Sequence, residues 1–122
     1  IAFIPRLVAK LREKPMIDIN ELKRQLDGEG DLLILDVRSA EDFVGQQGHL
    51  KVALNVPLEE LAERIEELDD HLEKAIAIIC RTDRRSAKAA ALLTRRGFAD
   101  VRVVQGGMTA WHERGWPVEA GS

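Results

Sequence analysis

Short apolar runs alternate with amphipathic stretches along almost the whole chain. A short apolar run predicts a buried strand, and apolar residues three or four positions apart predict a helix that packs on one side. The alternation predicts an α/β fold of three layers, in which a parallel central sheet of about five strands has helices on both faces. Strands are expected at 16–19, 32–35, 52–56, 75–79 and 101–104, and helices at 20–26, 58–68, 86–96 and 108–114.

The length of the chain limits the number of domains. At 122 residues it can bury one core but is too short for two. We expect an N-terminal basic amphipathic helix or linker at 1–15, one domain at 16–118 and a C-terminal tail at 119–122. The net charge of -3 argues against a nucleic-acid partner, and the sequence leaves the oligomeric state open.

The segment 1–15 has two interpretations. It is either a helix docked on the domain or the juxtamembrane end of a preceding membrane span, because clustered Lys and Arg favour the cytoplasmic side. The chain does not begin with methionine, so a longer, membrane-tethered parent chain is one expectation. No stretch reaches the ~18 to 20 apolar residues of a membrane span. The apolar residues of the segment are Ile4, Leu7, Val8 and Leu11, and the basic ones are Arg6, Lys10, Arg12 and Lys14.

Cys80 is the only cysteine, and it follows the apolar run 75–79 directly. A helix is expected to begin at Ser86 as its N-cap, so the backbone N–H groups of 81–86 have no intrahelical partners and can surround the sulfur. This position favours a nucleophile at the carboxyl end of a buried strand, where open parallel sheets bind ligands. The alternative is a buried apolar filler.

A single cysteine also limits other chemistry. It excludes an internal disulfide and an all-cysteine metal site, and it favours a reducing, cytoplasmic location. The three histidines lack the spacing of a helical metal pair, so we expect no metal.

The loop after Cys80 is rich in arginine. Arg81, Arg84 and Arg85 are expected to stabilise a thiolate and to attract an anion, whereas Asp83 offsets part of this positive charge. Three roles are open for Asp83. It discourages a dianionic ligand, pairs with Arg84 or Arg85, or accepts hydrogen bonds from loop N–H groups.

Two long stretches resemble a rhodanese domain of the thiosulfate sulfurtransferase family. CRTDRRSAKAAALLTRRGFADVRVVQGGMTAWHERGWPV is similar to the catalytic half, and LLILDVRSAEDFVGQQGHLKVALNVPL to the first half. The resemblance implies that Cys80 takes a sulfane sulfur from an anionic, thiosulfate-like donor and passes it as a persulfide to cyanide or a thiol, without any other cofactor. It also implies that Arg81 and Arg85 draw in the donor. The implied active-site loop with its closing residue is Cys80, Arg81, Thr82, Asp83, Arg84, Arg85 and Ser86.

The length of this loop separates alternative functions. Protein tyrosine phosphatases and the related Cdc25-type phosphatases share a Cys-x5-Arg pattern, which would require arginine in place of Ser86. Arg85 gives a shorter Cys-x4-Arg loop, so a phosphatase or an arsenate reductase is disfavoured. A binding or regulatory module, or a carrier that passes sulfur only to a specific partner, remains the main alternative. The family often has glycine where this chain has Asp83.

Residues elsewhere are expected to support the loop. Asp36 and Arg38 follow one strand and are expected to form a salt bridge rather than to act in catalysis, with Glu41 as a further candidate partner for Arg38. His49 resembles a structural position of the family. Gly106 and Gly107 allow a close backbone approach to the Cys80 loop. Met108 is expected to line the pocket wall.

Overall fold

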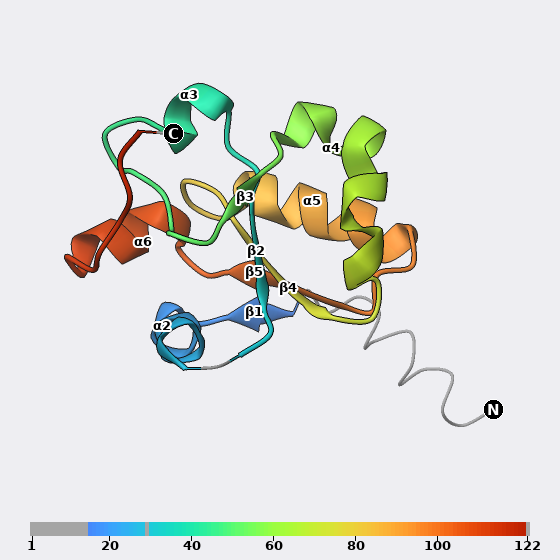
Figure 1. Cartoon of the computed structure of the whole chain (residues 1–122), viewed down its shortest axis with the longest axis horizontal. Coiled ribbons are helices and arrows are strands. Elements are labelled where there is room, and N and C mark those ends of the chain that lie inside the picture. Colours follow the sequence, from blue (N-terminus) through green and yellow to red (C-terminus); the bar gives the residue numbers. More distant parts are fainter. Residues whose placement is uncertain (1–14, 29, 122) are drawn as a thin grey trace.

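One parallel sheet forms the centre of the computed structural model, which describes residues 15–28 and 30–121 (Figure 1). Its five strands are β1 (Met16–Ile17), β2 (Leu33–Asp36), β3 (Leu54–Asn55), β4 (Ala75–Ile79) and β5 (Asp100–Val104). They lie in the order β1-β5-β4-β2-β3, and every neighbouring pair is parallel. The prediction of an α/β fold with about five parallel strands is therefore confirmed.

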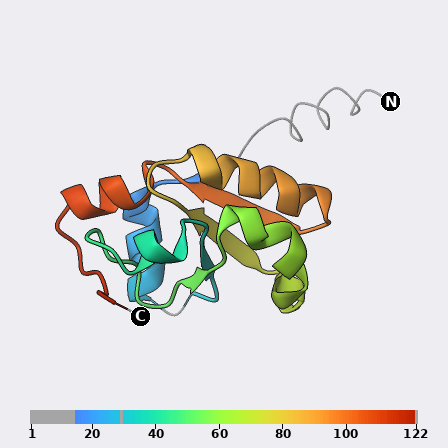
Figure 2. The ribbon, with the colours of Figure 1, turned by 90° about the horizontal axis from the view of Figure 1, so that it is seen from above.

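Helices cover both faces of the sheet. They are α2 (Ile19–Asp27), α3 (Ala40–Phe43), α4 (Leu58–Arg64), the 3-10 helix η1 (Ile65–His71), α5 (Arg84–Arg95) and α6 (Gly107–Glu113). Helices α4, η1 and α5 share one core cluster with the sheet, and α2 and α6 share a second. The two groups of helices lie on different sides of the sheet (Figures 1 and 2).

The central strand β4 sets the position of Cys80. Successive side chains of a strand point to opposite faces, and accordingly Ile76 and Ile78 belong to the cluster under α4 and α5, whereas Ala77 and Ile79 belong to the other. Cys80 continues the first set. Its side chain therefore lies on the α5 face, at the carboxyl end of a strand with neighbours on both sides.

Several element boundaries differ from those expected. Helix α5 begins two residues before Ser86, and it ends before Gly97, whose φ of 95° suits glycine. The helix expected at 58–68 ends at Arg64, and the 3-10 helix η1 continues it to His71. Helix α3 was not expected, because its four residues are too few to show a helical period.

The N-terminal segment is outside this description. Of the predicted helix or linker 1–15, all residues before Pro15 lie outside the described ranges. Its docked and juxtamembrane interpretations, and the boundaries of the domain, therefore stay predictions. Within 15–28 and 30–121, no helix has the length and apolar character needed to cross a membrane.

Candidate active site

Cys80 meets the first turn of helix α5. Its side chain is only 2% exposed, and the backbone N–H of Ser86 donates to its Sγ at 3.4 Å. Ser86 is the third residue of α5, so this N–H is one of the donors that the helix itself leaves unpaired. The prediction that Cys80 faces a helix N-terminus is confirmed, because its sulfur lies at the end of α5 that carries the partial positive charge of the helix dipole.

Ser86 is not the N-cap, which corrects the prediction from sequence. Asp83 occupies that position, and its carbonyl oxygen accepts from the N–H of Ala87 at 3.0 Å. The Asp83 carboxylate makes no capping hydrogen bond. An N-cap side chain normally accepts from the second or third N–H of its helix. Here the sulfur of Cys80 accepts from the third one, so it takes the place of the capping oxygen.

The N-terminus of α6 holds the start of the Cys80 loop. The N–H of Met108 donates to the carbonyl of Cys80 at 2.8 Å, and the N–H of Thr109 donates to the carbonyl of Arg81 at 2.9 Å. In a trans peptide the N–H points opposite to the C=O, and the described residues contain no cis peptide. The N–H groups of Arg81 and Thr82 therefore face away from α6. On that side the loop offers donors and not carbonyl oxygens.

Gly107 allows the close approach of α6 to this loop. A Cβ at this position would lie 2.2 Å from the carbonyl oxygen of Thr82 and 2.4 Å from that of Cys80, and φ is 55°. Only glycine fits both the contact and the backbone conformation. Gly106, with a φ of 80°, forms the N-cap of α6.

Met108 differs from its expected role. Its side chain is fully buried in the core cluster shared by α2 and α6, whereas Cys80 belongs to the cluster on the other face. Its backbone N–H contacts the Cys80 carbonyl, and its side chain packs in the core instead of forming a pocket wall.

The charged residues of the loop are exposed, but only one of them has an ion-pair partner in the described part of the chain. Nη1 of Arg85 lies 3.1 Å from Oε1 of Glu59, at the start of α4. Arg81, Arg84 and Asp83 form no ion pair with any described residue. Sequence reasoning missed Glu59, because 26 positions separate it from Arg85 and no local pattern joins them.

A groove of about 590 Å³ runs beside the loop, between α5 and the edge of the sheet. Asp83, Arg84 and Lys88 form its polar part, and Cys80 is not among its lining residues. The apolar part consists of Met16, Ala87, Ala91 and Val103. A molecule in this groove would contact charged side chains of the Cys80 loop.

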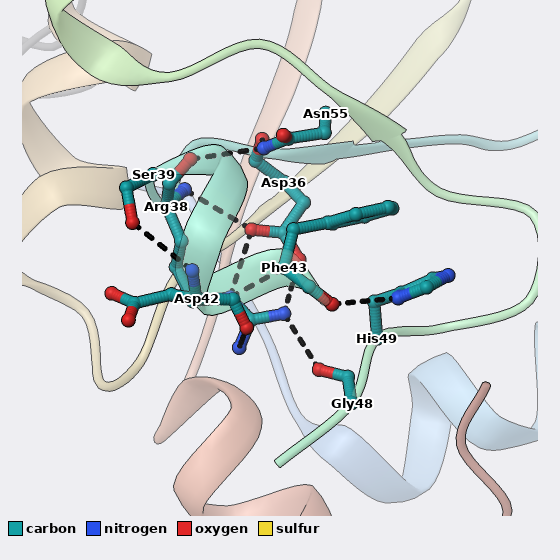
Figure 3. Close-up of polar contacts among 8 residues, drawn as sticks. All are labelled: Asp36, Arg38, Ser39, Asp42, Phe43, Gly48, His49 and Asn55. Atoms are coloured by element: carbon teal, nitrogen blue, oxygen red, sulfur yellow. Dashed lines mark hydrogen bonds and ion pairs between the residues drawn. The ribbon is translucent and has the colours of Figure 1, made fainter. Parts of the chain in front are cut away.

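Asp36 and Arg38 form a buried ion pair after β2 (Figure 3). Nη2 of Arg38 lies 2.7 Å from Oδ2 of Asp36, Nε donates to Oδ1 at 3.0 Å, and both residues are at most 3% exposed. The guanidinium also donates to the carbonyl oxygens of Gly48 and Asp42. Glu41, the further partner considered from sequence, makes no ion pair with Arg38. The pair fixes the segment that follows β2.

His49 also packs against the segment that follows β2. Its Nδ1 lies 2.7 Å from the carbonyl oxygen of Phe43, and the two rings stack with centroids 3.7 Å apart (Figure 3). The ring is nearly buried and is engaged in packing. Within the described ranges, no group of three or more His, Cys, Asp and Glu side chains could hold a metal ion.

Residues 18–114 match the Rhodanese-like domain family. The chain belongs to this family. The match covers most of the chain and includes every residue of the Cys80 loop, so the resemblance seen in the sequence is confirmed at the level of family and fold.

Two relatives are about one third identical to this chain over most of its length. A sulfurtransferase of Allochromatium vinosum is 31% identical over 104 residues, which are 85% of this chain and 94% of the relative. YrkF of Bacillus subtilis, for which a sulfur-carrier role has been suggested, is 36% identical over 97 residues, 80% of this chain and only 50% of YrkF. This chain thus spans about half the length of that relative.

A solved rhodanese structure shares the fold. The rhodanese-related protein of Thermoplasma volcanium is 30% identical and superposes with a TM-score of 0.75, over 86% of this chain and 97% of the solved chain. Among the relatives, the match covers nearly all of the Allochromatium vinosum sulfurtransferase but only half of YrkF.

Proposed function

We propose that this rhodanese domain transfers a sulfane sulfur through a persulfide on Cys80. The position of Cys80 Sγ carries the proposal. In a nearly buried site, it accepts a hydrogen bond from the N–H of Ser86, which has no partner within helix α5. Such fixed amide donors stabilise a thiolate, and they stabilise a persulfide anion in the same way. The names of the relatives, a sulfurtransferase and a suggested sulfur carrier, support the same chemistry.

The transfer has two displacement steps. In the first, the Cys80 thiolate attacks the outer sulfur of thiosulfate, a new S–S bond forms, and the electron pair of the old S–S bond leaves with sulfite. In the second, cyanide or a thiolate attacks the outer sulfur of the persulfide, and the electron pair of that bond returns to Cys80. Charge and electrons balance in both steps without a metal or a further cofactor, and we propose none.

Arg81 and Arg84 are the cations that attract the donor. Both are exposed and free of ion pairs in the described part of the chain, whereas Glu59 offsets the charge of Arg85. This assignment revises the role expected for Arg85. Arg85 is the arginine of the Cys-x4-Arg pattern, and its ion pair with Glu59 gives it a structural role. No observation on the described residues favours a phosphatase.

The proposal is tested by incubating the protein with thiosulfate and then with cyanide. We expect thiocyanate from the wild type, a persulfide on Cys80 by mass spectrometry, and neither product from Cys80→Ser. Equal thiocyanate from Cys80→Ser would disprove the mechanism. A persulfide without thiocyanate would support a carrier that needs a specific acceptor, and Cys80-dependent hydrolysis of an aryl phosphate at a comparable rate would favour a phosphatase.

The charge assignment gives a second prediction. Arg84→Gln is expected to lower kcat/KM for thiosulfate by about tenfold, because one unpaired positive charge is lost near a dianion. The double variant Glu59→Gln with Arg85→Gln removes an ion pair and leaves the net charge unchanged, so we expect less than a twofold effect. Both are compared by initial thiocyanate rates at low ionic strength. A larger loss in the double variant would contradict the assignment.

A further inference from the structure

Asp83 is an exposed acidic residue within the Cys80 loop that has no structural partner in the described ranges. The sequence left three roles open for it, and the structure removes two of them. The carboxylate forms no ion pair with Arg84 or Arg85, since Arg85 binds Glu59. It also makes no capping hydrogen bond at the start of α5. The remaining role is electrostatic: the negative charge of Asp83 discourages a dianionic ligand.

Asp83 belongs to the loop that carries the reacting sulfur, three positions after Cys80. Asp83 is the N-cap of α5, and an N-cap side chain can normally contact the N–H of the third helical residue. That N–H belongs to Ser86 and already donates to Sγ of Cys80. The Asp83 carboxylate does not make that contact, but it is exposed in the same loop and lines the groove beside it.

We infer that Asp83 determines donor specificity, and that it favours sulfane-sulfur donors with one negative charge over dianions. Thiosulfonates and the persulfides of uncharged thiols belong to the favoured class, and thiosulfate to the disfavoured one. This inference rests on the proposed function and names its substrate class. The loop attracts anions through Arg81 and Arg84, and Asp83 limits how much negative charge is accepted.

The electrostatic effect has a form that can be measured. A fixed charge repels each unit charge of a ligand about equally, so the factor for a dianion is the square of the factor for a monoanion. Removal of the Asp83 charge should raise kcat/KM about threefold for a monoanionic donor and about tenfold for thiosulfate. At about 1 M salt, where the Debye length is about 3 Å, both gains should nearly vanish.

The test compares thiosulfate with methanethiosulfonate as donors to cyanide, using the wild type, Asp83→Asn and Asp70→Asn. Asparagine keeps the size and the N-cap preference of aspartate, so the loop is expected to keep its conformation. Asp70 is exposed on η1, which continues α4 and is not part of the loop, so its variant controls for the change in net charge.

We expect the ratio of kcat/KM for thiosulfate to that for methanethiosulfonate to rise about threefold in Asp83→Asn and to stay unchanged in Asp70→Asn. An unchanged ratio in an active Asp83→Asn protein would overturn the specificity role and leave the proposed function intact. An equal rise in Asp70→Asn would also overturn it, because the effect would then come from net charge. Absence of transfer from either donor in all three proteins would overturn the proposed function, and this inference with it.

Discussion

Gly107→Ala is expected to lower the rate of sulfur transfer about a hundredfold and to lower the free energy of unfolding by about 3 kcal/mol or more. The new Cβ would lie 2.2 Å from the carbonyl oxygen of Thr82 and 2.4 Å from that of Cys80. Both atoms belong to the backbone, so no side chain can move aside to relieve the collision. Either α6 or the Cys80 loop must shift.

The shift would reach the sulfur directly. The N–H groups of Met108 and Thr109 hold the carbonyls of Cys80 and Arg81, and these bonds orient the amides of the loop. If they lengthen, the loop amides lose the orientation in which we propose that they stabilise a persulfide anion at Cys80. A misplacement of the reacting groups by about 1 Å commonly lowers the rate by a factor of about one hundred.

Gly115→Ala is the matched control. Gly115 has a φ of 68°, close to the 55° of Gly107, but a Cβ there would meet no atom within 4 Å. This variant therefore measures the cost of the left-handed backbone alone, about 1 to 2 kcal/mol. Urea unfolding and thiocyanate rates are measured for both variants. If Gly107→Ala lost no more stability than Gly115→Ala and kept its activity, the loop would not depend on this contact.

The sequence predicts the fold and the position of Cys80 well, because both depend on local patterns. Apolar runs and helical spacing indicate the strands and helices, and Cys80 directly follows an unbroken apolar run. The start of α5 was placed two residues late, because Ser86 is a favoured N-cap residue in its own right. No local pattern shows that a sulfur atom takes the capping role from Asp83.

Contacts between distant segments could not be predicted from the sequence. Glu59 and Arg85 meet because α4 packs beside α5. The side chain of Met108 could have pointed to either face of the sheet, and only the assembled core decides between them. The ion pair of Asp36 with Arg38 could be predicted, because the two residues are only two positions apart. Its burial could not be predicted, because it depends on how the whole chain packs.

Asp36→Ala is expected to lower the free energy of unfolding by about 3 to 5 kcal/mol, because it leaves the buried guanidinium of Arg38 without its counter-ion. The carbonyl oxygens of Gly48 and Asp42 still accept from Arg38, but neither carries a negative charge. The effect should extend toward the active site. Val37, between the two residues, donates to the carbonyl of Ile79, next to Cys80.

The chain contains a control for this prediction, since the tripeptide Asp-Val-Arg occurs twice. Asp100 and Arg102 form an ion pair with the same spacing and a similar 3.0 Å contact, but their side chains are 39% and 36% exposed. Exposed pairs contribute about 0 to 1 kcal/mol, so Asp100→Ala should change stability by no more than that. Urea unfolding of both variants compares one sequence motif in two environments. Equal losses would show that burial does not set the strength of the Asp36–Arg38 pair, and the larger loss expected for Asp36→Ala would show that it does.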